Sequence, residues 1–155
     1  MSAETITTAI FLITAVVATA VLVNAIYPVI YTTAGTFQSS THDADTRLRT
    51  DFKIVATFAT SNQANIYLKN IGSQRISMVE IEKADVFCGT VGNRLTYDQS
   101  LIPINTWTAD LLPADGYWDT GDTLHITTYN TNVGTVYFQF ILPNGIWRST
   151  EFTAS

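Results

Sequence analysis

The chain has 155 residues, of which 46% are hydrophobic and only 14% are charged, and its formal net charge is −5. This length suits one domain, or one domain with an attached segment, and the apolar content excludes intrinsic disorder. Because the balance is acidic, there is no basic excess to neutralise phosphates, and the sequence predicts no nucleic-acid partner.

The N-terminal segment carries almost no charge. Glu4 is the only charged side chain before Asp43. Thr5–Tyr31 is apolar and long enough to cross a bilayer, which needs about 20 such residues. It is also rich in Ala and Thr, which let helices approach one another closely. Two interpretations stay open: a single membrane anchor, or a helix that sits in lipid first and later packs into a bundle of identical helices.

The helix is predicted to continue beyond the apolar run. Apolar or small residues recur at spacings of 3, 4, 3 and 4, which match a coiled-coil seam: Ala34, Phe37, Thr41, Ala44 and Leu48. We therefore expect a hydrophobic membrane or assembly helix at 1–48, kinked at Pro28, and a separate domain at 49–155. The candidate assembly residues on this helix are Glu4, Ala9, Ile13, Ala20, Phe37 and Leu48.

Glu4 has two explanations. A carboxylate at the start of an apolar helix suits the membrane–water boundary and the positive end of the helix dipole. Alternatively, it pairs with the N-terminal amine of a neighbouring subunit, as a charge buried in a helix bundle would require.

From Asp51 onward the apolar period changes from helical to two, which is typical of half-buried strands. The predicted strands are 51–59, 64–70, 76–82, 84–88, 123–129, 135–142 and 145–152, with a less periodic stretch at 95–112. Asn144-Gly145 predicts a hairpin turn. Seven or eight short strands indicate an antiparallel immunoglobulin-like β-sandwich, so the fold class is α+β. The expected core anchors are Ile66, Leu68, Trp107, Tyr137 and Trp147.

Few residues offer catalytic or metal-binding chemistry. Asp115, Asp119 and Asp122 lie in a Gly- and Pro-rich stretch where turn geometry alone favours Asp, and their spacing is not that of an EF-hand. We keep them as candidate contacts for a partner protein, with calcium as the other option. His125 is predicted to face solvent and Cys88 to be a buried hydrophobe. The sequence predicts no enzyme, no cofactor and no metal centre.

Five stretches carry a resemblance to a known family. They are Thr5–Ile13, Arg49–Val55, Leu68–Ser73, Gly121–Ile126 and Phe140–Ile146. The chain resembles archaeal type IV pilin-like proteins, and among them the FlaF/FlaG-type stator proteins of the archaellum. The resemblance implies a homo-oligomer rooted in the cytoplasmic membrane, with its sandwich in the pseudoperiplasm or at the cell surface. It also implies a FlaF-like partner that contacts the S-layer, so that the motor works against a fixed structure.

Two alternatives to a stator remain. One is an archaellin or pilin-like subunit of an extracellular filament, and the other is a membrane-tethered extracellular module that binds proteins. Met1–Glu4 has no basic leader with a Gly before a cleavage site, which favours an unprocessed stator over a filament subunit. The positive-inside count would place the sandwich in the cytoplasm. Because Arg47, Arg49 and Lys53 lie well beyond Tyr31 and alternate with acidic residues, we follow the pilin-like topology.

Overall fold

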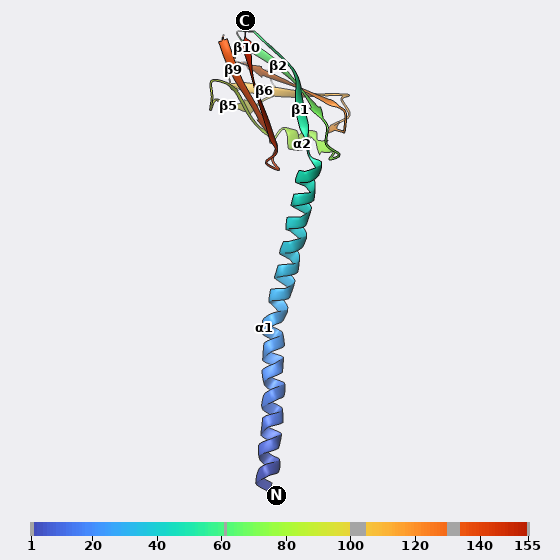
Figure 1. Cartoon of the computed structure of the whole chain (residues 1–155), viewed down its shortest axis with the longest axis vertical. Coiled ribbons are helices and arrows are strands. Elements are labelled where there is room, and N and C mark those ends of the chain that lie inside the picture. Colours follow the sequence, from blue (N-terminus) through green and yellow to red (C-terminus); the bar gives the residue numbers. More distant parts are fainter. Residues whose placement is uncertain (1, 61, 100–104, 130–133, 155) are drawn as a thin grey trace. The chain divides into compact units, whose positions relative to one another are not determined.

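A computed structural model of the chain describes residues 2–60, 62–99, 105–129 and 134–154 (Figure 1). The chain divides into two compact units, Met1–Asp43 and Ala44–Ser155, each of which is described by itself. The first unit consists of helix alone. The second contains the last turn of that helix and a domain built almost entirely of β-strands.

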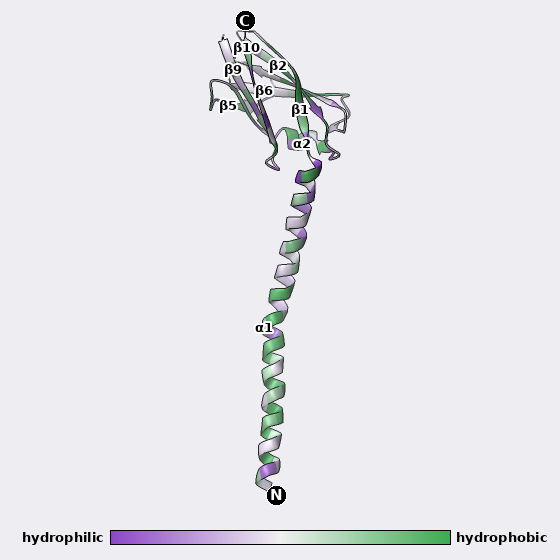
Figure 2. Cartoon of the chain, viewed as in Figure 1, coloured by the Kyte–Doolittle hydropathy of each residue, from purple (hydrophilic) through white to green (hydrophobic). Residues whose placement is uncertain are grey.

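The N-terminal helix α1 (Ser2–Arg49) is a single element of 48 residues, and Pro28 lies inside it without ending it. Glu4 in its first turn, and Arg47 and Arg49 in its last turn, match the charges that the helix dipole favours. Figure 2 shows that α1 is mostly hydrophobic over its N-terminal part and more hydrophilic toward its C-terminal end. None of the described residues of α1 is buried.

Within the described residues, ten strands and one short helix follow α1. They are β1 (Phe52–Ala59), β2 (Gln63–Asn70), β3 (Ile76–Ser77), α2 (Met78–Ile81), β4 (Asp85–Gly89), β5 (Arg94–Tyr97), β6 (Thr106–Leu112), β7 (Tyr117–Trp118), β8 (Thr123–Tyr129), β9 (Gly134–Ile141) and β10 (Trp147–Ala154).

Eight of these strands form one sheet in the order β1-β2-β8-β6-β5-β4-β9-β10, and β3 and β7 form a separate two-stranded ribbon. Neighbours in the sheet pair antiparallel except β5 and β6, whose parallel pairing joins the β1-β2-β8-β6 half to the β5-β4-β9-β10 half. The first and last strands of this order, β1 and β10, lie side by side without a hydrogen-bonded ladder. The α+β prediction, a long apolar helix followed by a mostly antiparallel β-domain, is confirmed.

The core lies between the two halves of the sheet. In β2 every second side chain is buried, as the period-two pattern predicts. Ile66, Leu68 and Trp107 are fully buried, which confirms three expected anchors. The other two are wrong: Tyr137 is only half-buried, and Trp147 is 51% exposed. The side chains that are buried in β9 and β10 lie an odd number of residues from Tyr137 and Trp147, on the opposite face of each strand. They are Val136, Phe138, Phe140 and Ala154.

The strand predicted at 76–82 is also wrong. Its first two residues form β3, and helix α2 then begins because the Ser77 side chain and Glu80 form a capping box. Strand β7 was not predicted at all, because two residues are too few to show a period. Its Trp118 is nevertheless fully buried and packs against Phe52, with ring centroids 5.7 Å apart.

Candidate assembly surface

The apolar surface of α1 is exposed along its whole length. Large hydrophobic side chains around the helix, such as Ile13, Val16 and Leu22, are each 59–69% exposed. The helix is also long and apolar enough to cross a membrane, with a mean hydropathy of 2.5 over its most apolar 18-residue window. A helix that is hydrophobic on every side belongs in lipid or inside an assembly of helices, because water would leave all of that surface unfavourably hydrated.

The six predicted assembly residues all lie on α1 and are all exposed. Ala9, Ile13 and Ala20 are separated by 4 and 7 residues, so they share one face of the helix. Glu4 lies in the first turn, and Leu48 is 87% exposed in the last turn. The structure therefore presents these residues on one helix, and their role in assembly stays a prediction.

The threonine hydroxyls of α1 are bonded within the helix. Thr7, Thr14 and Thr19 each donate to the carbonyl oxygen four residues earlier, at 2.8 Å. The hydroxyls of Tyr27 and Tyr31 bond each other at 3.0 Å. These bonds satisfy polar atoms that would otherwise be costly in a hydrocarbon environment.

The last turn of α1 is held by the loop after β2. The backbone amides of Ser73 and Gln74 donate to the Arg49 carbonyl at 2.9 and 3.1 Å. Those of Ile71 and Gly72 donate to the Asp51 carbonyl at 3.0 and 2.8 Å. The end of the helix is therefore capped by amides from another part of the chain, which satisfies carbonyls that a helix C-terminus leaves without partners.

Gly72 is required by space at this junction. A Cβ atom there would lie 2.3 Å from the Arg49 carbonyl oxygen and 2.5 Å from the Asp51 amide nitrogen. Asn70, only 1% exposed, fixes the same loop: its amide group donates to the carbonyls of Gln74 and Trp118, and its side-chain oxygen accepts from the Gly72 amide. Sequence analysis predicted that the helix gives way to the β-domain at residues 48–49 but did not predict these contacts, for which the Asn70-Ile71-Gly72-Ser73 turn was the only local signal.

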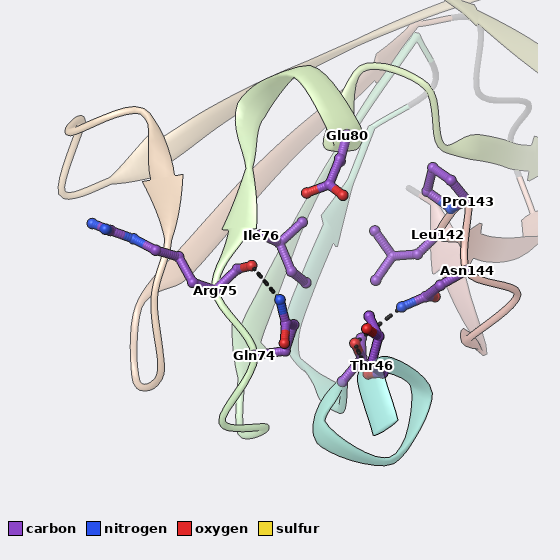
Figure 3. Close-up of a pocket in the computed structure, with 9 residues that line it drawn as sticks. Thr46, Gln74, Arg75, Ile76, Glu80, Leu142, Pro143 and Asn144 are labelled. Carbon is purple, nitrogen blue, oxygen red and sulfur yellow. Dashed lines mark hydrogen bonds between the residues drawn. The ribbon is translucent and has the colours of Figure 1, made fainter. Parts of the chain in front are cut away.

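A small cavity adjoins the junction (Figure 3). Its walls come from the last turn of α1, from residues 74–76 and α2, and from the hairpin between β9 and β10, where the Asn144 amide donates to the Thr50 hydroxyl at 3.0 Å. Its volume of about 50 Å³ is far below the roughly 300–1,000 Å³ of ligand pockets. The cavity is a packing detail of the junction and offers no room for a substrate.

The three predicted acidic contacts lie together beside β7. Carboxylate oxygens of Asp115, Asp119 and Asp122 come within 4.8 Å of one another. Asp115 accepts the Tyr117 amide and Asp122 accepts the Asp119 amide, which is the turn geometry that the sequence suggested. Asp119 also pairs with Arg75 at 2.8 Å. Because that guanidinium already occupies one carboxylate, the cluster suits a structural turn better than a cation.

Cys88 is 3% exposed, as predicted, and its sulfur lies 3.3 Å from the Thr128 hydroxyl. Burial raises the pKa of this thiol above its usual range, so it is poorly suited to act as a nucleophile. His125 is half-buried on the outer face of β8. Its ring stacks on Tyr67 with centroids 4.6 Å apart, and its Nε2 lies 3.0 Å from the Asn65 side-chain oxygen.

Comparison with known proteins fits this helix-and-sheet architecture. Residues 2–152 match the archaeal-type flagellin family, and the chain belongs to that family. An uncharacterized protein of Archaeoglobus fulgidus is 26% identical over 162 residues, covering 99% of each chain.

Two solved structures illustrate the shared fold. The archaellum periplasmic stator protein FlaG from Sulfolobus acidocaldarius is 24% identical, with a TM-score of 0.55 over 66% of this chain and 99% of that chain; a complex of FlaF and FlaG has also been solved. The archaeal flagellum of Methanospirillum hungatei strain JF1 is 15% identical, with a TM-score of 0.67 over 97% of this chain and 93% of that chain.

Proposed function

We propose that this member of the archaeal-type flagellin family is a structural component of the archaellum that acts as a stationary anchor. Helix α1 roots the protein in the cytoplasmic membrane and associates with other copies. The β-domain, proposed as residues 49–155, lies outside the membrane and links the motility machinery to the cell envelope. A FlaF-like protein and the S-layer are its proposed partners.

The observation that carries this proposal is the contrast between the two units. The β-domain buries its own core, whereas the described residues of α1 bury nothing within the chain. The apolar N-terminal part of this 48-residue helix covers no core, so it has to be covered by lipid or by other helices. In an anchor that assembles in the membrane, lipid covers part of the helix and other copies of the helix cover the rest. The likeness to a periplasmic stator protein supports that role.

A filament subunit is the second candidate. It is favoured by the match to an archaeal flagellum, which extends over 97% of this chain and so includes the helix. A filament subunit would also cover α1 with copies of itself, so the exposed apolar surface alone does not distinguish the two roles.

Mechanical shearing of cells distinguishes them. Tagged full-length protein is expressed in an archaellated host, and the sheared filaments are separated from the cell envelopes. We expect the protein to stay with the envelopes while archaellin is released. Recovery with the sheared filaments would favour the subunit role. Envelope retention, with normal motility after deletion of the gene, would favour a tethered binding module instead.

A helix variant provides the matched control. Ile13→Asp places a charge inside the apolar run and should abolish envelope retention, because a charge within the hydrocarbon part of a bilayer is costly. Ile13→Leu keeps the apolar surface and should behave as the unmodified protein.

A further inference from the structure

In the apolar run Thr5–Tyr31, Asn24 is the one side chain whose hydrogen-bonding groups find no partner in the described chain. Between Thr5 and Tyr31 the threonine hydroxyls bond to carbonyls of their own helix, and the two tyrosine hydroxyls bond each other. A primary amide surrounded by hydrocarbon is costly unless it is hydrogen-bonded. The amide therefore needs a partner from outside the chain.

Asn24 singles out one seam of α1, because the helix is apolar on every side and hydrophobicity alone favours none. Steps of 3 and 4 residues in both directions from Asn24 give Ile6, Ile10, Ile13, Val17, Ala20, Asn24, Tyr27, Tyr31 and Ala34. In heptad terms Asn24 occupies an a position, and the preceding a positions, Ile10 and Val17, are β-branched. β-Branched residues at a favour two strands when Leu occupies d, but here the preceding d positions are Ile6, Ile13 and Ala20. The number of helices therefore depends on Asn24, because a single Asn at a specifies register and oligomeric state.

The seam predicted for the C-terminal part of the helix begins at the same residue, Ala34. There the step from Tyr31 to Ala34 and the step from Ala34 to Phe37 are both three residues, which shifts the heptad register. The two seams therefore differ in register, and the N-terminal one, from Ile6 to Tyr31, lies within the segment that is long enough to span a bilayer.

We propose that Asn24 bonds Asn24 of a second copy of this chain, in a parallel and in-register pair of α1 helices inside the membrane. The amide is self-complementary, because its NH₂ donates and its oxygen accepts, so two copies related by a two-fold axis satisfy each other. The inference deepens the proposed function and rests on its membrane-rooted helix. Helices staggered along a filament axis would not bring equal residues opposite each other.

Disulfide trapping of full-length protein in lipid vesicles tests this pairing. In a Cys88→Ala background, single cysteines replace Val17 on the seam or Val16 beside it, as a matched pair. We expect a symmetric disulfide dimer from Val17→Cys and little from Val16→Cys. Adding Asn24→Val should weaken dimerisation by about five-fold, the effect of losing roughly 1 kcal/mol of interhelical hydrogen bonding in a membrane.

Exchanging the residues at positions 23 and 24 gives the sharpest control. The double variant Val23→Asn/Asn24→Val keeps the composition but rotates the amide by about 100° around the helix. Residue 16 is seven positions before residue 23, so cross-linking should move from Val17→Cys to Val16→Cys. Equal cross-linking at both positions, or no effect of Asn24→Val, would overturn the pairing. Cross-links that form only between different positions would overturn the in-register arrangement.

These outcomes are independent of the shearing experiment. An envelope-retained protein that does not cross-link would sink the Asn24 pairing and leave the anchor role standing. A protein released with sheared filaments would remove the anchor role, whatever the cross-linking shows.

Discussion

Gly72→Ala should destabilise the β-domain through the junction with α1. The new methyl carbon would sit 2.3 Å from the Arg49 carbonyl oxygen and 2.5 Å from the Asp51 amide nitrogen. Both are backbone atoms, so neither can swing aside as a flexible side chain could. The loop must move away, which disturbs the four amide–carbonyl bonds that it makes to Arg49 and Asp51. At roughly 0.5–1.5 kcal/mol for each bond, and with water replacing some of them, we expect a loss of about 2–4 kcal/mol.

Chemical unfolding of the full-length protein in detergent measures this loss, with fluorescence of the buried Trp107 and Trp118 as the signal for the β-domain. Ser73→Ala is the matched control, because Ser73 contributes its backbone amide and its side chain is exposed. Its unfolding midpoint should stay near that of the unmodified protein. If Gly72→Ala unfolds at the same denaturant concentration as Ser73→Ala, the close packing at the junction does not limit stability.

Three further outcomes are expected. Removal of residues 1–42 should leave a soluble protein with a cooperative thermal transition, since the core lies wholly in the second unit; an insoluble product would contradict this division. Burial raises the pKa of Cys88, so iodoacetamide should not modify it at pH 8 until urea unfolds the domain, as followed by mass spectrometry; rapid modification of the native protein would show an open core. Glu4→Gln should block assembly but not membrane insertion if the carboxylate pairs with a neighbouring amine, because breaking a buried pair costs roughly 3–5 kcal/mol; normal assembly seen by electron microscopy would exclude the pairing.

The period-two alternation of apolar residues and the residues typical of turns predicted most strands of the β-domain. The alternation in β2 and the Asn144-Gly145 turn gave correct elements because local side-chain pattern and local backbone preference agree there. The phase was predicted wrongly in β9 and β10. In β9 the alternation does carry the phase, because Val136, Phe138 and Phe140 are all apolar whereas Tyr137 alternates with Thr135 and Gln139; the size of one aromatic residue was a poorer guide. In β10 the alternation is weak, since the phase of the buried Ala154 also contains Arg148 and Thr150.

The parts that sequence analysis missed depend on contacts between distant segments. Asn70 is a polar residue at the end of a strand, and nothing local shows that it bonds the Trp118 carbonyl 48 residues away. Gly72 looks like an ordinary turn glycine, whereas its need for space comes from the end of α1. The Ser77–Glu80 capping box was different, because its spacing is visible in the sequence and was overlooked in favour of strand alternation.

Hydrophobicity cannot determine which face of α1 meets another helix, because all of its faces are apolar. Polar side chains carry that information instead. A hydroxyl that bonds its own helix, such as that of Thr14, is equally satisfied against lipid and against protein. The Asn24 amide instead favours a protein neighbour that can hydrogen-bond it. The number of unpartnered polar groups in an apolar helix therefore limits how many specific interfaces it can encode. In the described residues from Thr5 to Tyr31 a single such group, the Asn24 amide, fixes a single face, and the remaining surface is free to contact lipid or less specific neighbours.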